Sequence, residues 1–272
     1  MQFFKYIFCI LVYRNTEDLT ECLVSIRHKV SDCKIIIVNA FYDDQSKVEF
    51  EKIARDNNCD FISIPNKGYS FGNNRGIEFA INHYEFDCLI VANPDITIDK
   101  FDTSDIDVTS PQVIAPIIKT IGNKNQNPYW LIKNRLGERL IYLGMKNRNR
   151  LMLFFAYGIN KIIREIGLNI FMRTRKHKMK VYAAHGSFCM FTHSCLKKLG
   201  LPYDENMFLF AEEALLADVL EKKNIDVYLT KDIVITHKED GSMNIANIDE
   251  MHEERKSIIY YYEKINQKGR RF

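Results

Sequence analysis

Two adjacent glutamates, Glu212 and Glu213, stand where a helix is expected to begin, directly after the aromatic run Phe208–Phe210. Consecutive helical residues point about 100° apart, so only one of the two carboxylates faces a given centre. A carboxylate held in this way can act as a general base when a substrate proton lies within hydrogen-bond reach. Acids in the first helical turn also interact favourably with the helix dipole, so a structural role is the alternative interpretation.

The tripeptide Asn93-Pro94-Asp95 follows an apolar run and suggests a second kind of chemistry. Pro94 lacks a backbone N–H and ends the strand, so Asp95 is expected to project from the edge of the sheet. Hard cations prefer oxygen ligands, so this carboxylate can bind Mg²⁺ or Mn²⁺ beside a pyrophosphate. His237 follows another apolar run, and its imidazole can complete the coordination. Each of these motifs taken alone is also typical of an ordinary turn.

The segment Asn66–Gly76 contains three glycines and three asparagines within eleven residues. This composition allows close backbone approach and supplies amide donors, which suits a nucleotide or a sugar hydroxyl. The segment is neither a Walker loop nor a GxGxxG motif, and a plain surface loop is the competing interpretation. Gly241-Ser242, shortly after His237, is expected to form a flexible turn that offers a hydroxyl to phosphate.

Apolar runs alternating with amphipathic segments predict the elements that position these residues. The expected strands are 6–13, 34–38, 61–64, 88–92, 112–118, 188–191 and 233–236, and the expected helices start at 16, 48, 76 and 212. Thr16 is expected to cap the first helix. The order predicts an α/β fold with a mostly parallel sheet flanked by helices, in which ligands sit at the carboxyl ends of the strands. Polar residues that follow predicted strands should therefore converge on one edge: Asn15, Asn39, Asn66 and Asp95.

The 272-residue composition is that of a globular protein, with 46% hydrophobic and 27% charged residues and a net charge of only +3. This small charge argues against a general polyanion binder. The seven cysteines have neither metal-ligand nor disulfide-framework spacing, so buried reduced thiols and a reducing cytosol are expected. The apolar run Phe3–Tyr13 is about half a membrane span, and a buried first strand explains it better than a signal peptide.

Positive charge is concentrated between Lys146 and Lys180, which includes ten Lys or Arg residues and one acid. Apolar residues recur there at helical spacing: Leu151, Phe154, Phe155, Ile159, Ile162, Ile163, Ile166 and Ile170. One interpretation is an amphipathic helix on an anionic membrane surface. The alternative is a helical subdomain whose apolar stripe packs on the sheet. Nucleic acid binding is not expected, because the aromatic residues lie on the stripe and are not interleaved with the charges.

Taken in order, these motifs resemble family 2 glycosyltransferases, and more narrowly the rhamnosyltransferase-like branch of bacterial surface polysaccharide synthesis. The resemblance spans about residues 4–242. It rests on Tyr13, Asn15, Val38-Asn39, the spacing Asn66-x-Gly68 to Gly76, Asn93-Pro94-Asp95, Gly186-Ser187-Phe188, Asp204-Glu205, Phe208-Leu209-Phe210-x-Glu-Glu213 and His237.

The resemblance implies a Rossmann-like GT-A fold, an inverting mechanism and a UDP-, dTDP- or GDP-sugar donor held by Mg²⁺ or Mn²⁺. It assigns the metal to Asp95 and His237, the catalytic base to Glu213 with Glu212 as the alternative, and the acceptor side to Gly186 and Ser187. The donor side is assigned to Tyr13, Asn15, Asn39, Asn66, Gly68, Asn73, Asn93 and Asp95. The implied acceptor is a growing cell-surface glycan or a lipid-linked glycan, reached from the cytoplasmic face of the plasma membrane.

Three positions depart from the family pattern. Asn39 stands where an Asp usually contacts the nucleoside, Glu213 stands where the base is often an Asp and is longer by one methylene, and Leu215 stands where many relatives carry an acid. In addition, the Arg expected further along the same helix is absent, and Asp218 lies near its place. A catalytically inactive nucleotide-sugar-binding protein and a sugar nucleotidyltransferase therefore remain as alternatives. The expected organisation is a nucleotide-sugar-binding half (1–118), a basic and partly helical insertion (119–180), and an acceptor and catalytic half with a C-terminal helix (181–272).

Overall fold

The computed structural model describes residues 1–238 and 249–267, so the expected turn at Gly241-Ser242 lies outside the described residues. The first half of the chain alternates strands and helices: β1 (Gln2–Val12), α1 (Thr16–Lys29), β2 (Cys33–Phe41), α2 (Asp44–Asp56), β3 (Asp60–Pro65), α3 (Tyr69–His83), β4 (Tyr84–Ala92), β5 (Ile96–Phe101) and β6 (Gln112–Thr120). The second half contains α4 (Arg135–Lys146), α5 (Arg150–Arg173), β7 (Lys178–Val181), β8 (Phe188–Thr192), α6 (His193–Leu199), α7 (Glu212–Lys222), β9 (Asp226–His237) and α9 (Glu250–Gln267).

One sheet runs through the molecule in the strand order β3-β2-β1-β4-β8-β6-β9-β5, and β7 pairs with β9. Strands β3, β2, β1 and β4 are parallel neighbours, as the connecting helices predict. Strand β8 lies antiparallel between β4 and β6, and β6 is parallel to β9. The predicted α/β fold with a mostly parallel central sheet is therefore confirmed, and its second half is mixed. Residues from the two expected halves share this sheet.

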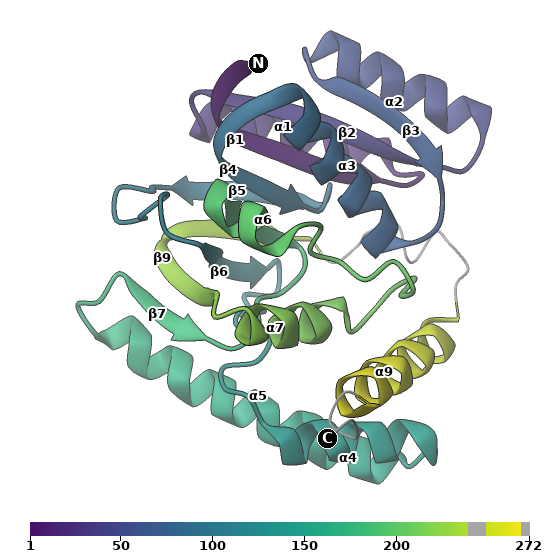
Figure 1. Cartoon of the computed structure of the whole chain (residues 1–272), viewed down its shortest axis with the longest axis vertical. Coiled ribbons are helices and arrows are strands. Elements are labelled where there is room, and N and C mark those ends of the chain that lie inside the picture. The colour runs from purple at the N-terminus through teal and green to yellow at the C-terminus, as the bar shows by residue number, and fades with distance from the viewer. Residues whose placement is uncertain (239–248, 268–272) are drawn as a thin grey trace.

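Alternation of side chains along β1 divides the core into two faces. Tyr6, Phe8 and Ile10 pack on the side covered by α1 and α2, whereas Ile7 and Cys9 pack on the side covered by α3, α6 and α7. A third apolar cluster joins α4, α5, α7 and α9. Figure 1 shows α4, α5 and α9 together at the end of the molecule opposite α1 and α2. The described part of the chain contains no helix with the length and apolar composition that a membrane span requires.

The segment Asn66–Gly76 is not the loop that its composition suggested, because α3 begins at Tyr69. A Cβ on Gly72 would collide with Leu11, and one on Gly76 would lie 2.8 Å from Val38 Cγ2. These glycines therefore allow α3 to approach the sheet closely, and only Gly68, with φ of +97°, needs the left-handed region. The expected helix start at Gly76 was wrong because Gly was interpreted as a loop signal.

The cap of α1 also differs from the sequence expectation. Asn15, not Thr16, is the N-cap, and its Oδ1 accepts hydrogen bonds from the backbone N–H groups of Glu17 and Asp18 at 3.1 and 3.4 Å. Asn and Thr are both good caps, and the two candidates differ only in where the backbone turns. The expected burial of the reduced thiols is confirmed for most of them: five of the seven free cysteines are buried, and Cys33 and Cys59 are half-buried.

Candidate active site

Strand pairing brings Asp95 and His237 together at the edge of the sheet. β5 and β9 pair antiparallel with Ile96 opposite His237, and the N–H of Lys238 donates to the carbonyl of Asp95 at 3.0 Å. His237 Nε2 consequently lies 3.2 Å from Asp95 Oδ1, and both side chains are buried. Apart from this contact, Asp95 Oδ1 has no hydrogen-bond partner among the described residues. A buried oxygen with unused acceptor capacity beside an imidazole nitrogen is a suitable place for a cation.

Two residues that the sequence analysis missed surround His237. Gln126 Oε1 lies 2.7 Å from His237 Nδ1, and the ring of His185 lies 5.8 Å from the His237 ring, centroid to centroid. A proton on Nδ1 shared with Gln126 leaves the Nε2 lone pair facing Asp95. Gln126 lies in a loop without a recognisable motif, so no local pattern marks it as a site residue. His185 directly precedes Gly186-Ser187, and this adjacency was a usable signal.

His185 is held as a neutral imidazole. Its Nδ1 accepts the backbone N–H of Ser187 at 3.2 Å, and the backbone N–H of His185 donates to Asn127 Oδ1 at 2.7 Å. Burial, and to a smaller extent the charges of His237 and Arg164, lower the pKa of His185 to about 3.

The segment Gly186-Ser187 contacts both Glu213 and Asn93, which precedes Asp95 by two residues. The N–H of Gly186 donates to Glu213 Oε1 at 3.2 Å, and the carbonyl of Gly186 accepts the Tyr69 hydroxyl at 2.7 Å. The N–H of Asn93 donates to the carbonyl of Ser187 at 2.9 Å. Asn93, Gly186, Ser187 and Glu213 are therefore connected by hydrogen bonds, and Tyr69 is a further member that the sequence analysis did not identify.

The two glutamates differ in their surroundings. Glu212 is buried, and its Oε2 has no hydrogen-bond partner among the described residues. Burial and then the charge of Glu213 raise the pKa of Glu212 well above its ordinary value. Burial also raises the pKa of Glu213, but hydrogen bonds, including the one from the Gly186 N–H, oppose this. A carboxylate with a pKa nearer to neutrality is a better proton acceptor and donor.

Aromatic residues lie at the carboxyl ends of β1 and β2. Tyr13 and Tyr42 make an edge contact with ring centroids 5.7 Å apart, and the Arg14 guanidinium lies 3.4 Å from the Tyr42 centroid. Asn39 was expected after β2 but lies within it, fully buried, with Nδ2 donating to Ser63 Oγ at 3.2 Å. Its Oδ1 has no partner among the described residues. Tyr42 is a further candidate that the sequence analysis did not select.

Other predicted donor-side residues already make local hydrogen bonds. Asn15 caps α1, Asn66 Oδ1 accepts the Gly68 N–H at 3.2 Å, and the buried Asn73 donates to the Tyr69 carbonyl at 3.1 Å. The N–H of Tyr69 donates to the carbonyl of Phe208 at 2.7 Å, so the start of α3 is fixed to the segment that precedes α7. Gly68 and Tyr69 thus help to position the start of α7, where Glu213 lies.

The departures from the family pattern at Leu215 and Asp218, both on α7, have structural explanations. Leu215 is buried in the cluster shared with α4 and α9. Asp218 is also buried, and it pairs with Lys133 at 3.3 Å and with Lys222. An acid at position 215 or a cation at 218 would disturb this packing, because buried charges need paired partners.

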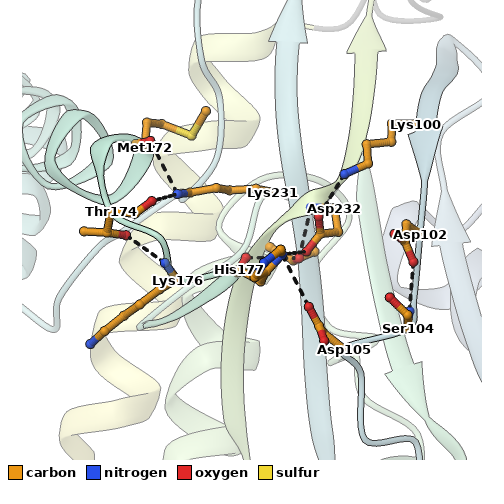
Figure 2. A network of polar contacts seen from close by, with 11 residues as sticks. Lys100, Asp102, Ser104, Asp105, Met172, Thr174, Lys176, His177, Lys231 and Asp232 are labelled. Atoms are coloured by element: carbon orange, nitrogen blue, oxygen red, sulfur yellow. Dashed lines mark hydrogen bonds and ion pairs between the residues drawn. The ribbon is translucent and has the colours of Figure 1, made fainter.

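A second group of potential metal ligands lies around Asp232 of β9. One ligand atom from each of Asp105, His177 and Asp232 lies within 4.8 Å of the others. Figure 2 shows that Lys100 points at the same carboxylate, with its Nζ 2.8 Å from Asp232 Oδ1. This ammonium already balances the charge of Asp232, and Asp105 and His177 are mostly exposed. The group is therefore best explained as an ion-pair network that fastens the segment after α5 to β9.

The fold places the chain among GT-A-like structures. GalNAc-T7, in a crystal structure with UDP, GalNAc and Mn²⁺, matches 86% of this chain and 44% of its own with a TM-score of 0.60 at 11% identity. Residues 1–349 of TarS from S. aureus match 98% of this chain and 73% of that fragment with a TM-score of 0.57 at 13% identity. The same fragment in complex with UDP-GlcNAc gives a TM-score of 0.55 at 14% identity, over 95% of this chain and 66% of that one.

Sequence comparison finds a relative of this chain. The low-salt glycan biosynthesis hexosyltransferase Agl10 of Haloferax volcanii is 25% identical over 224 residues, which is 80% of this chain. The chain is thus the homologue of a hexosyltransferase, and it spans 62% of that relative's length. No model of a known protein family matches the chain.

Proposed function

We propose that the protein is a glycosyltransferase that moves a hexose from a nucleotide-diphosphate donor to a glycan acceptor. The observation that carries the proposal is the connection between Asp95, His237 and Glu213. Asp95 and His237 lie 3.2 Å apart, and the segment from His185 to Ser187 contacts both His237 and Glu213. The hexosyltransferase relative supports the same reaction class, as do the similar structures of GalNAc-T7 with UDP, GalNAc and Mn²⁺ and of TarS with UDP-GlcNAc.

A divalent cation fits the residues present. Asp95 offers a buried carboxylate oxygen that lacks a hydrogen-bond partner, and His237 offers Nε2, while its Nδ1 is engaged with Gln126. One carboxylate and one imidazole suit Mn²⁺ or Mg²⁺ with open positions for phosphate oxygens. When bound, such an ion supplies positive charge that stabilises the departing diphosphate.

Glu213 is the base in this proposal. Its Oε1 is positioned by the Gly186 N–H, so the carboxylate can accept the acceptor hydroxyl proton as that oxygen bonds to the anomeric carbon. The bond from the anomeric carbon to the diphosphate breaks in the same step, which inverts the configuration. Glu212 is the alternative base. Burial and the charge of Glu213 raise the pKa of Glu212 well above its ordinary value, which favours its neutral form and makes it the less suitable base.

The partners follow from the same reasoning. Exposed Tyr42 and half-buried Tyr13 offer aromatic surface to a nucleobase at the ends of β1 and β2, and UDP is the first donor to try, ahead of dTDP and GDP. Gly186 and Ser187 line the acceptor side. We place the reaction in the assembly of a cell-surface glycan, with a glycan or lipid-linked acceptor at the cytoplasmic face of the plasma membrane, in the rhamnosyltransferase-like branch.

The test is a thermal-shift screen of UDP-, dTDP- and GDP-sugars with and without Mn²⁺, followed by donor hydrolysis. A ligand present at about 100 times its dissociation constant adds about 2.7 kcal/mol to the free energy of unfolding, enough to rank the donors. Metal-dependent stabilisation with slow hydrolysis of one donor supports the proposal. Stabilisation without hydrolysis or transfer favours an inactive binding protein, and release of pyrophosphate from a nucleoside triphosphate and a sugar phosphate favours a nucleotidyltransferase.

A further inference from the structure

Helix α5 presents an apolar face to solvent. The side chains on this face recur every three or four residues, which places them in one stripe along the helix. Phe154 is 72% exposed and Ile170, near the other end, is 61% exposed. The stripe, called here the α5 face, consists of Phe154, Phe155, Ile159, Ile162, Ile166 and Ile170. A patch of this kind on one helix is unusual for an isolated soluble domain and marks an interaction surface.

The opposite side of α5 is fixed against the body of the protein, so the apolar face cannot turn inward. Leu168 and Phe171 are buried in the main core, while the Arg164–Glu165 pair is at least half-buried. The Tyr157 hydroxyl donates to Glu254 Oε1 at 2.9 Å, which ties the helix to α9. The alternative that the stripe packs on the sheet is therefore wrong: the sheet-facing residues of α5 are different ones.

Lys231 of β9 holds the carboxyl end of α5 in place through polar contacts, which Figure 2 shows. Lys231 Nζ donates to the Thr174 carbonyl at 2.8 Å and to the Met172 carbonyl at 3.4 Å, and it lies over the Phe171 ring. His177, a few residues further on, is held by Asp232 at 2.7 Å. The Asp232 network thus keeps the helix in one orientation with the α5 face outward.

Basic residues flank the α5 face at both ends. Exposed cations precede and begin the helix and also follow its last turn: Lys146, Arg148, Arg150, Arg173, Arg175 and Lys176. Within residues 1–238 and 249–267, no carboxylate forms a salt bridge with any of these six. An apolar stripe with unpaired cations at its rim matches a surface of acyl chains beneath anionic headgroups.

We propose that α5 docks the protein flat on an anionic lipid surface, with the α5 face among the upper acyl chains and the flanking cations at the headgroups. Charge complementarity selects this occupant over a second copy of the chain. Two α5 faces packed together would bring their basic ends near one another in either relative direction, and like charges repel. Nucleic acid would meet the cations but leave the apolar face in water.

This docking places the candidate site close to the membrane. Asn160 on α5 donates to the Tyr129 carbonyl at 3.3 Å, and the Tyr129 ring lies 6.4 Å from the His185 ring. The helix that meets lipid is thus separated from His185 by a single residue. If the proposed transferase function holds, an acceptor anchored in the same bilayer reaches Glu213 without leaving the membrane surface. The docking itself does not depend on that function.

The test is cosedimentation of the purified chain with vesicles, without any substrate. We expect binding to phosphatidylglycerol–phosphatidylcholine vesicles that is at least about tenfold stronger than binding to phosphatidylcholine alone. Binding should fall steeply towards about 1 M NaCl, where the Debye length is about 3 Å. The double substitution F154E/F155E should weaken binding at least about tenfold, since it places two carboxylates where the proposal has apolar side chains among the acyl chains. Val48→Glu, at a position 62% exposed on α2, is the matched control and should bind as wild type does.

The outcomes separate docking from the reaction. Equal binding to both vesicle types, no binding, or full binding by F154E/F155E overturns the proposal. A dimer in light scattering that F154E/F155E disperses, together with absence of vesicle binding, overturns it in favour of an interface between copies. Vesicle binding by a chain that neither binds nor hydrolyses nucleotide sugars leaves the docking surface intact and refutes only the proposed function. Circular dichroism and urea unfolding of both variants verify that they fold.

Discussion

Gln126 Oε1 lies 2.7 Å from His237 Nδ1, and this contact fixes which nitrogen of the imidazole faces Asp95. Carbonyl oxygens only accept hydrogen bonds, so the proton belongs on Nδ1 and the lone pair on Nε2. Partners of this type orient metal ligands and raise their basicity. Gln126 is therefore a positioning residue for the proposed metal site.

The first prediction concerns this contact. Gln126→Leu keeps the size of the side chain but removes the acceptor, so Mn²⁺ affinity should fall about 10–100-fold. Gln126→Glu restores an acceptor and should keep or increase the affinity. Calorimetry or electron paramagnetic resonance measures Mn²⁺ binding without reference to turnover. Lys124→Ala, in the same loop and exposed, is the control. Unchanged affinity in Gln126→Leu would contradict the role assigned to Gln126.

The second prediction distinguishes the two groups of potential metal ligands. Asp95→Asn and His237→Ala should each lose Mn²⁺ binding and metal-dependent donor stabilisation, because each removes one of two protein ligands. Asp105→Asn, in the exposed Asp232 network, should bind Mn²⁺ as wild type does. Chelation with EDTA should stop donor hydrolysis, and added Mn²⁺ should restore it. Loss of binding in Asp105→Asn instead would move the metal site to that network.

The third prediction identifies the base. Glu213→Gln should lower kcat by about 10²–10⁴ with little change in donor affinity, since only the proton acceptor is removed. Glu212→Gln should lower kcat less, because the proton acceptor Glu213 is retained. Steady-state kinetics across pH measures both effects. Near-normal turnover by Glu213→Gln would transfer the role of base to Glu212.

The fourth prediction is a pH dependence of stability. The pKa of Glu212 in the folded chain is raised above its ordinary 4.5, so the folded state binds more protons than the unfolded state at pH values above 4.5. The contribution of this group to stability is therefore complete below pH 4.5 and is lost as pH rises through the folded pKa, by up to about 1.4 kcal/mol per pH unit. Urea unfolding between pH 4.5 and 8 should show a steeper fall in wild type than in Glu212→Gln. Identical slopes would disprove the raised pKa.

The fifth prediction compares two glycines. Gly68 has a positive φ, and a Cβ there would collide with the Phe208 backbone, so Gly68→Ala should destabilise the fold by about 1–3 kcal/mol. Gly158 lies within α5 and a Cβ there meets nothing within 4 Å, so Gly158→Ala should stabilise by up to about 1 kcal/mol. Urea midpoints measure both. Equal effects of the same sign would mean that the contact between Gly68 and Phe208 does not constrain the chain.

Much of the fold follows from local patterns. Continuous apolar runs marked β1, β2, β4 and β8 to within a few residues, because strands buried on both faces leave no polar alternation to misread. The carboxyl-end rule predicted that Asp95 lies at an edge of the sheet, and the place of His237 after another apolar run suggested that it lies beside Asp95; the two side chains are 3.2 Å apart. The start of α3 was predicted wrongly, because Gly72 and Gly76 were interpreted as loop residues. Both instead allow close packing against Leu11 and Val38, which are distant in sequence.

The amino-acid sequence by itself determined the α/β class, the start of α7 at Glu212 and the amphipathic character of α5, since each depends on residues close together in the chain. Only the tertiary structure decided that Gln126 and His185 surround His237, that Gly186 holds Glu213, and that the apolar face of α5 points outward. Those facts depend on strand register and helix docking between distant segments. Periodicity reveals that a helix has an apolar side, but only its packing partners decide whether that side meets the core or the surroundings.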